Sequence, residues 1–229
     1  ITDSLVGSEM CIRDSSYPEH QFLGEEDVET HGNVHQGSEQ PLWIIDPIDG
    51  TTNFSRQIPH FCVSLACAIK GKIEHAVIIH PVTNDEYVAS RGKGAQLNGR
   101  KIRVSQREQI AGSVFACAGR FPKGPVRDGH AKICEAIDEG DGNFREPGSA
   151  ALELANLAAG RIDGVWIRRV NLWDFAAGAL LVQEAGGLAG DFVGGVQHFK
   201  TGDIVAANPK LFKVLGGLVR EHLGPHATK

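Results

Sequence analysis

The chain has 229 residues, of which 41% are hydrophobic and 22% are charged, and its formal net charge is -5. This length and composition fit one large or two small globular units with a sizeable core. No apolar run approaches the roughly eighteen residues that span a bilayer, no basic segment precedes an apolar signal core, and the negative net charge argues against nucleic acid as a bulk electrostatic partner.

Cysteine usage points to a reducing compartment. The five cysteines are scattered and have no CxxC spacing, so the sequence predicts neither a disulfide framework nor a structural zinc site. We therefore expect a soluble, cytoplasmic protein.

The N-terminal segment differs in character from the rest. Residues 4–15 show no helical or strand periodicity and resemble a translated sequencing-adaptor read-through. Such a sequence would not belong to the native fold, so we expect residues 1–16 to be a non-native or disordered segment. A single domain is expected over 17–229, with a first α+β half over 17–110 and a second α/β half over 111–229.

A pair of carboxylates follows the first apolar run. Residues 42–45 are predicted to form a buried strand, and Pro47 and Gly50 are expected to turn the chain directly after it. Asp46 and Asp49 would then project from a rigid strand end, where clustered oxygen ligands suit Mg²⁺ or Mn²⁺ better than zinc. The alternative is that these are ordinary turn dipeptides before a capped helix.

Three strands are expected next, at 61–69, 73–80 and 86–90, joined by short turns into an antiparallel meander. Asn98-Gly99 then marks a hairpin turn.

The second half alternates strands and helices. Strands are predicted at 114–118, 162–167 and 203–207, a loop at 119–129, and helices at 131–139, 150–159, 171–185 and 209–223. Ser149 and Asn208 are the expected N-caps of the second and fourth helices, Gly160 stops the second, and Asp174 lies in the first turn of the third.

Three motifs in chain order resemble those of the inositol monophosphatase family. They are GEE at 24–26, WIIDPIDGTTNF at 43–54 and WDFAAG at 173–178. That family belongs to a wider group of Mg²⁺-dependent, lithium-sensitive phosphatases, which includes fructose bisphosphatases and nucleotide 3'-phosphatases. The resemblance implies an α+β fold, a layered αβαβα sandwich, with a homodimer as the common assembly.

The resemblance also implies a set of metal ligands. Glu25, Asp46 and the backbone carbonyl of Ile48 would hold one Mg²⁺, and Asp46, Asp49 and Asp174 a second, with room for a third ion and with Mn²⁺ as a substitute. In such sites the metal lowers the pKa of a bound water. Thr51 and Glu25 would orient that water for attack on phosphorus, so Thr51, Glu25 and Asp49 form the expected catalytic set and no covalent phosphoenzyme is expected.

Substrate contacts are implied on both sides of this cluster. Backbone N–H groups of Gly50, Thr51 and Thr52 would hold phosphate oxygens. The other implied contacts come from Gly148, Ser149, Ala150 and Asp174.

The chain departs from the family pattern at two places. Ile167 stands where many members carry a glutamate that contacts sugar hydroxyls, and the family's usual N-terminal segment is partly missing before Gly24. Arg56, Arg168 and Arg169 are the basic residues nearest to the motifs. We expect all three on the surface, with the last two as candidates for recognising a second anionic group.

The expected function is therefore Mg²⁺-dependent hydrolysis of a small phosphate monoester, such as inositol monophosphate or a related sugar or polyol phosphate. Histidinol phosphate, fructose bisphosphate and nucleotide 3'-phosphate remain alternative substrates. A non-catalytic regulatory protein that retains the fold, acting in an RNA-associated complex, is the alternative of another class. The histidines of the first half lack ligand spacing, and we expect surface or packing roles for them.

Overall fold

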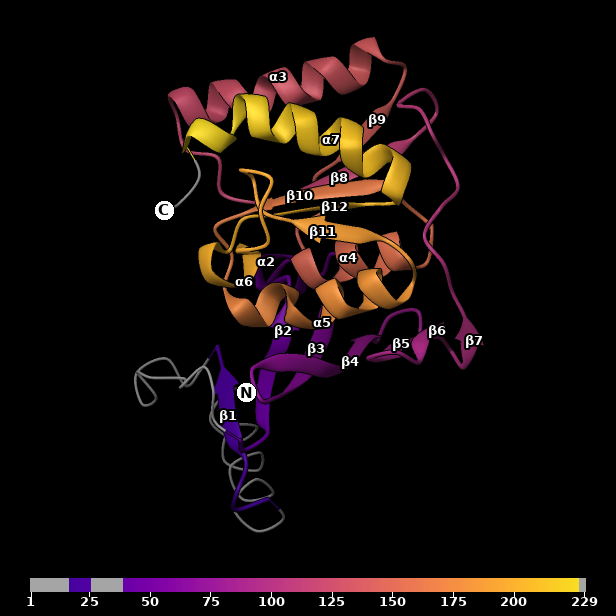
Figure 1. Cartoon of the computed structure of the whole chain (residues 1–229), viewed down its shortest axis with the longest axis vertical. Helices are drawn as coiled ribbons and strands as arrows, with labels where there is room; N and C mark the ends of the chain where they lie inside the picture. Colours follow the sequence, from indigo (N-terminus) through magenta and orange to yellow (C-terminus); the bar gives the residue numbers. More distant parts are fainter. Residues whose placement is uncertain (1–16, 26–38, 227–229) are drawn as a thin grey trace.

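A computed structural model describes residues 17–25 and 39–226. Its elements stack in layers (Figure 1). At the foot of the view lies a seven-stranded sheet, followed by a pair of helices, a five-stranded sheet and a second pair of helices. The expected layered α+β fold is confirmed, and the described residues supply four of its five layers. Segments 1–16 and 26–38 lie outside the described residues, so the expectation for residues 1–16 stays a prediction.

The seven-stranded sheet follows chain order. Its strands are β1 (Gln21–Gly24), β2 (Leu42–Asp49), β3 (Cys62–Ile69), β4 (Lys72–His80), β5 (Asp85–Ser90), β6 (Gly94–Leu97) and β7 (Arg100–Lys101). β1 and β2 are parallel and every later pair is antiparallel, which confirms the meander.

The first predicted strand is longer than expected. β2 does not stop at Ile45 but continues to Asp49, with a shift of register against β3 between Asp46 and Asp49. Pro47 lies within this shift, where the loss of a ladder hydrogen bond is tolerated. The expectation of a turn at Pro47 was therefore wrong, and the turn comes at Gly50.

The five-stranded sheet has the order β11-β12-β10-β8-β9. Its strands are β8 (Val114–Gly119), β9 (Asn143–Arg145), β10 (Gly164–Arg168), β11 (Leu188–Gly190) and β12 (Ile204–Ala207). β8, β9 and β10 are mutually parallel, and every residue of β10 is buried because helices cover both faces of this sheet. β1, β9 and β11 were not predicted, since strands of three or four residues offer little periodicity.

Two helices fill the space between the sheets, and two cover the outer face of the second sheet (Figure 1). The inner pair is α4 (Ala150–Ala158) and α5 (Leu172–Glu184), and the outer pair is α3 (Pro125–Glu139) and α7 (Pro209–His222). Three short helical segments complete the described fold: α2 (Thr51–Ser55), α6 (His198–Thr201) and the 3₁₀ segment η1 (Gly224–His226).

The helix predicted from residue 131 starts earlier, at Pro125. Proline is well suited to a first helical turn, where its missing N–H costs nothing. Gly129 lies within the helix, where α3 crosses α7 so closely that only glycine fits. An added Cβ would lie 2.2 Å from the carbonyl oxygen of His222. The loop predicted at 119–129 was therefore wrong over 125–129, where Pro125 begins the helix and Gly129 allows a close helix contact.

The predicted caps are confirmed. Ser149 accepts a hydrogen bond from the backbone N–H of Leu152, and Asn208 accepts from the N–H groups of Lys210 and Leu211. Asp174 lies in the first turn of α5, where its carboxylate accepts from the N–H of Asn171 at 2.6 Å. These contacts satisfy N–H groups that a helix start leaves without intrahelical partners.

The expectation for Arg168 was wrong. This side chain at the end of β10 is only 4% exposed, and its guanidinium donates to the carbonyl of Arg120 at 3.1 Å. Arg56 and Arg169 are exposed, as expected. Arg168 is buried because the loop after β8 and His226, in the 3₁₀ segment η1, cover the end of its strand.

Cys62, Cys67, Cys117 and Cys134 are free thiols in the described part of the chain, and Cys11 lies outside it. Within the same described part, every helix is too short or too polar to span a membrane.

Candidate metal and phosphate site

Three aspartates from two distant parts of the chain meet between the two sheets. Asp46 and Asp49 come from the end of β2, and Asp174 comes from the first turn of α5. Each offers a carboxylate oxygen, and these oxygens all lie within 4.8 Å of one another. Asp46 is 1% exposed and Asp49 is 7% exposed. The structure therefore brings together the three aspartates that the motifs single out.

Burial raises the pKa of each of these carboxyl groups, and the charge of at least one neighbouring carboxylate adds to each rise. Burial is the largest cause for Asp46 and brings its pKa to about 8, with further increases from the charges of Asp49, Asp174 and Glu25. Burial likewise raises the pKa of Asp174 to about 7. Clustered buried carboxylates hold protons unless a cation replaces them, so this all-oxygen donor set fits Mg²⁺.

Glu25 approaches the same cluster from β1. Because β1 and β2 are parallel and Gly24 pairs with Ile45, Glu25 follows β1 beside the start of the aspartate segment. Its charge contributes to the raised pKa values of Asp46 and Asp174, although its side chain is exposed. Ile48, whose carbonyl is an expected ligand, donates its backbone N–H to Asp46 Oδ1 at 2.9 Å.

Asp49 is held by the start of α4. The Ser149 hydroxyl donates to Asp49 Oδ2 at 2.5 Å, and the N–H of Ala151 donates to the same oxygen at 2.8 Å. Burial raises the pKa of Asp49, and these two hydrogen bonds oppose the rise. A carboxylate at a helix N-terminus is also favoured by the helix dipole. Ser149 is fully buried and orients Asp49, whereas its contact with substrate stays a prediction.

Cys62 adds a contact that the sequence did not reveal. Its buried thiol donates to Asp49 Oδ2 at 3.8 Å and lies 3.6 Å from the Ser149 hydroxyl. The only signal for it was its place at the start of a predicted strand.

Replacing Ser149 by alanine should weaken metal binding as well as the fold. The variant removes both a helix cap, worth about 1 kcal/mol, and a hydrogen bond that orients Asp49. Loss of such an outer partner typically lowers metal affinity by roughly 10–100-fold. Calorimetric titration with Mn²⁺ measures the affinity. Ser113→Ala is the matched control, because Ser113 is equally buried and its hydroxyl bonds Gln109 instead. Equal affinities in the two variants would contradict the role of Ser149.

The turn after β2 lies against the loop before α4. Gly50 has φ 93° at the start of α2, and an added Cβ would lie 3.1 Å from the carbonyl oxygen of His60, so only glycine fits. Asn53 is buried in α2 and donates to the carbonyls of His60 and Pro147, both at 2.8 Å. These hydrogen bonds connect residues 50–52, which are expected to bind phosphate, with residues 148–150, which are expected to contact the rest of the substrate. Thr51 and Thr52 are exposed beside them.

Two other residues give the site its surroundings. Glu153 is 2% exposed in the first turn of α4, and His60 Nε2 lies 2.7 Å from its carboxylate. The sequence suggested no role for Glu153 and only a surface or packing role for His60, because neither motif nor spacing links the two residues. Ile167 is fully buried in the core between the sheets and offers no polar atom from its side chain to a substrate.

Known proteins resemble the chain over most of its length. Nus factor SuhB from Pseudomonas aeruginosa is 44% identical over 215 residues, an alignment that covers 92% of this chain and 78% of that protein. The crystal structure of extragenic suppressor protein SuhB from Bartonella henselae matches with a TM-score of 0.81 and 36% identity, covering 91% of this chain and 78% of that one.

The structure of inositol monophosphatase from Anabaena (Nostoc) matches with a TM-score of 0.82 and 32% identity over 97% of this chain and 88% of that one. The sequence model described as the inositol monophosphatase family matches residues 3–223. With this match, the shared layered fold and the three motifs, the chain belongs to the inositol monophosphatase family.

Proposed function

We propose that this chain hydrolyses a small phosphate monoester with the help of Mg²⁺. The observation that carries the proposal is the convergence of Asp46, Asp49 and Asp174, whose oxygens lie within 4.8 Å of one another. Burial disfavours the ionised form of these carboxylates unless a cation is bound. Mg²⁺ is the cation that such a set of oxygen ligands prefers. Membership of a family that contains inositol monophosphatases supports the same chemistry.

The residues divide into holding and orienting groups. Glu25, Asp46, Asp49, Asp174 and the carbonyl of Ile48 would hold two or three Mg²⁺ ions. When bound, such ions lower the pKa of a coordinated water and stabilise charge on phosphate oxygens.

The remaining groups would position water and phosphate. Thr51 would orient the attacking water together with Glu25, and backbone N–H groups of Gly50, Thr51 and Thr52 would bind phosphate oxygens. Gly148, Ser149 and Ala150 lie across from that turn, joined to it through Asn53, and would line the space for the alcohol part of the substrate.

The substrate class is a small alcohol phosphate. Ile167 has no polar group where a hydroxyl-binding glutamate is common, so recognition of a polyol should be weaker by about 1.5–3 kcal/mol unless another group replaces it. Inositol phosphate therefore stands beside histidinol phosphate, fructose bisphosphate and nucleotide 3'-phosphate as a candidate.

Phosphate release tests the proposal. The four candidate substrates are assayed with Mg²⁺, with Mn²⁺, with Mg²⁺ plus Li⁺, and with EDTA. Release that needs Mg²⁺ or Mn²⁺ and falls with Li⁺ is expected for at least one substrate. Release that continues unchanged in EDTA would contradict a metal-dependent reaction.

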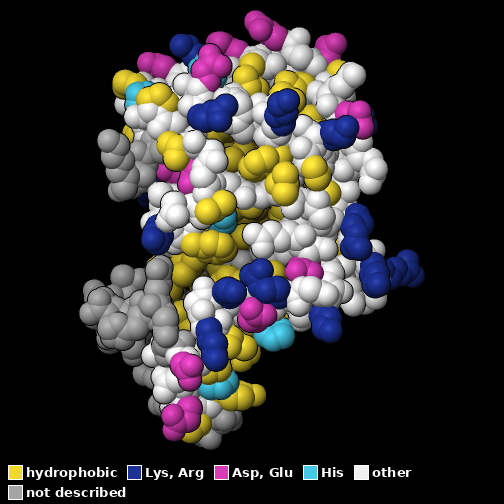
Figure 2. All heavy atoms as spheres, in the orientation of Figure 1, with side chains coloured by type: hydrophobic (Ala, Val, Ile, Leu, Met, Phe, Trp, Pro, Cys, Tyr) yellow, Lys and Arg dark blue, Asp and Glu magenta, His cyan; other side chains and the backbone are white. Residues whose placement is uncertain are grey.

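A second function, without catalysis, is supported by the relatives named Nus factor SuhB. We propose that this chain can also act as a non-catalytic regulatory protein that binds partner proteins through its surface. Its net charge of -5 and the mixture of acidic and basic side chains on the face in Figure 2 favour contact with proteins over direct nucleic-acid binding. Complementation of a bacterium that lacks its own SuhB separates the two functions. Equal rescue by wild type and Asp49→Asn is expected, and failure of both would contradict the regulatory function. A cytoplasmic location and a homodimer remain predictions.

A further inference from the structure

A second group of metal-binding side chains lies on the other face of the five-stranded sheet. Cys117 on β8, His130 on α3 and Glu146 after β9 each offer one ligand atom, and these atoms lie within 4.8 Å of one another. Cys117 is packed with the residues under α3 and α7, while its neighbours Ala116 and Ala118 face α4 and α5. The sheet therefore separates this group from the aspartate cluster.

We propose that Cys117, His130 and Glu146 form a binding site for Zn²⁺ or a similar transition-metal ion. Thiolate, imidazole and carboxylate are the ligands that zinc takes in proteins, whereas the all-oxygen aspartate cluster suits Mg²⁺. Zinc–ligand bonds in a tetrahedral site put ligand atoms roughly 3.4–3.8 Å apart. Ligand atoms already within 4.8 Å need only small side-chain movements to reach that separation.

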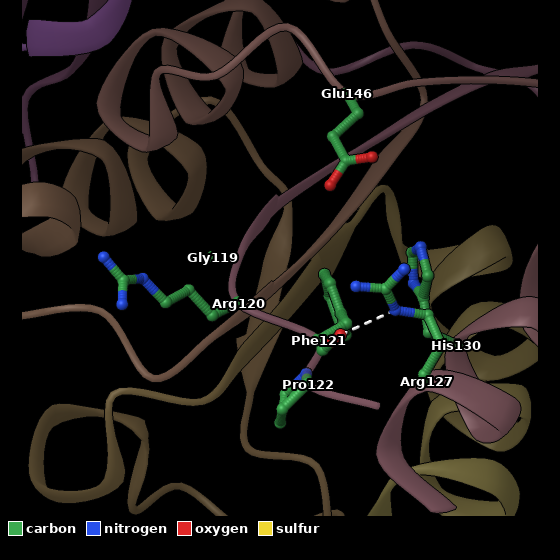
Figure 3. Close-up of a pocket in the computed structure, with 7 residues that line it drawn as sticks. All are labelled: Gly119, Arg120, Phe121, Pro122, Arg127, His130 and Glu146. Carbon is green, nitrogen blue, oxygen red and sulfur yellow. Dashed lines mark hydrogen bonds between the residues drawn. The ribbon is translucent and has the colours of Figure 1, made fainter. Parts of the chain in front are cut away.

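The surroundings provide access and an additional donor. A cavity of about 410 Å³ opens beside the group and is lined by His130 and Glu146 among others. In Figure 3 Glu146 lies above the other lining residues with its carboxylate turned towards them, while Arg120 points away. Cys134, one turn along α3, has its sulfur 3.7 Å from His130 Nε2. An ion held here could complete its coordination with water from the cavity or with this second thiol.

Binding would change hydrogen bonds that the structure shows. The Trp166 indole N–H donates to His130 Nδ1 at 3.2 Å, so the neutral ring carries its proton on Nε2. A metal bound to Nε2 moves that proton to Nδ1 and ends the bond from Trp166, while the Cys117 thiol releases its proton to solvent. The fully buried Trp166 should therefore report binding through its fluorescence.

The sequence does not predict this group of ligands because its members come from three separate parts of the fold. His130 and Cys134 are four residues apart on one face of α3, but Cys117 and Glu146 meet them only through parallel pairing of β8 and β9. The absence of CxxC spacing predicted no structural zinc site, and that rule does not apply to ligands gathered by tertiary packing.

Titration of the full chain with Co²⁺ tests the proposal. Co²⁺ substitutes for Zn²⁺ and gives visible bands and a near-ultraviolet thiolate charge-transfer band when it binds sulfur. The titration uses a Cys11→Ser background, which removes the cysteine outside the described residues. We expect about one equivalent of Co²⁺ with a thiolate band, a change in tryptophan fluorescence, and competition by Zn²⁺.

Variants locate the ion. Cys117→Ser should weaken the thiolate band, and Cys117→Ser combined with Cys134→Ser should abolish it. Glu146→Gln should lower the affinity at least tenfold, since even outer-shell losses cost roughly 10–100-fold. Glu146 is exposed, so its variant leaves the core intact, whereas Cys117 is fully buried. Cys67→Ser, at another buried thiol, is the control and should keep the band. Absence of a thiolate band in the parent chain, or equal affinity in Glu146→Gln, would overturn the proposal.

Discussion

Asp49→Asn is expected to lower Mg²⁺-dependent phosphate release by at least about 100-fold, because removing a direct ligand should cost no less than losing one of its outer partners. The substitution keeps the size of the side chain but removes the charge that the cation needs. It also leaves Ser149 and Ala151 as donors to a neutral amide group in place of a carboxylate. Initial rates with the preferred substrate at several Mg²⁺ concentrations measure the effect.

Asp138→Asn provides the matched control. Asp138 is an exposed carboxylate on α3, outside the aspartate cluster, so its loss should leave the rate unchanged. Thermal unfolding of both variants checks that each is folded. Comparable rates for Asp49→Asn and wild type would rule out the proposed metal site as the origin of activity.

The metal-free protein is expected to lose stability as the pH rises from about 5 to 8. The pKa of Asp46 is about 8 and that of Asp174 about 7 in the fold, against an ordinary value of 3.8, mainly because of burial. At a pH between the ordinary and the raised pKa, the unfolded chain has released protons that the folded chain retains. A rising pH therefore favours unfolding. For Asp46 alone the loss between pH 5 and pH 7 is on the order of 3 kcal/mol. Above about pH 8 this contribution becomes constant.

Urea unfolding in EDTA at pH 5 and pH 8 measures this loss. Asp46→Asn removes the titrating group, so the metal-free variant should be more stable than wild type at pH 8 and show a smaller change with pH. Saturating Mg²⁺ should reverse the order at pH 8, because it stabilises the ionised carboxylates of wild type. An identical pH dependence in wild type and Asp46→Asn would contradict a raised pKa of Asp46 in the folded protein.

Local signals predicted the elements whose patterns are long or carry a cap. The alternation in β3, β4 and β5 marked three neighbouring strands, and Ser149 and Asn208 marked two helix starts, because each signal acts within a few residues of the chain. The start of α3 was placed too late because Gly129 indicates a loop unless one knows that α7 passes directly over it.

For the site, the sequence by itself determined the chemical type of the ligands. Two aspartates three residues apart at the end of an apolar strand, with Glu25 before them and Asp174 after them, predict an oxygen-lined cation site, and the motifs that contain them identify the family.

The tertiary structure alone decided how these residues are held. The hydrogen bond from Ser149 to Asp49 joins residues 100 positions apart, and Asn53 reaches Pro147 across 94. Tertiary packing likewise buries Arg168 and brings Cys117, His130 and Glu146 together on the outer face of the five-stranded sheet. The physical reason is that side-chain type and local backbone preference depend on near neighbours. Contacts between distant segments depend on which faces of the sheets and helices pack together.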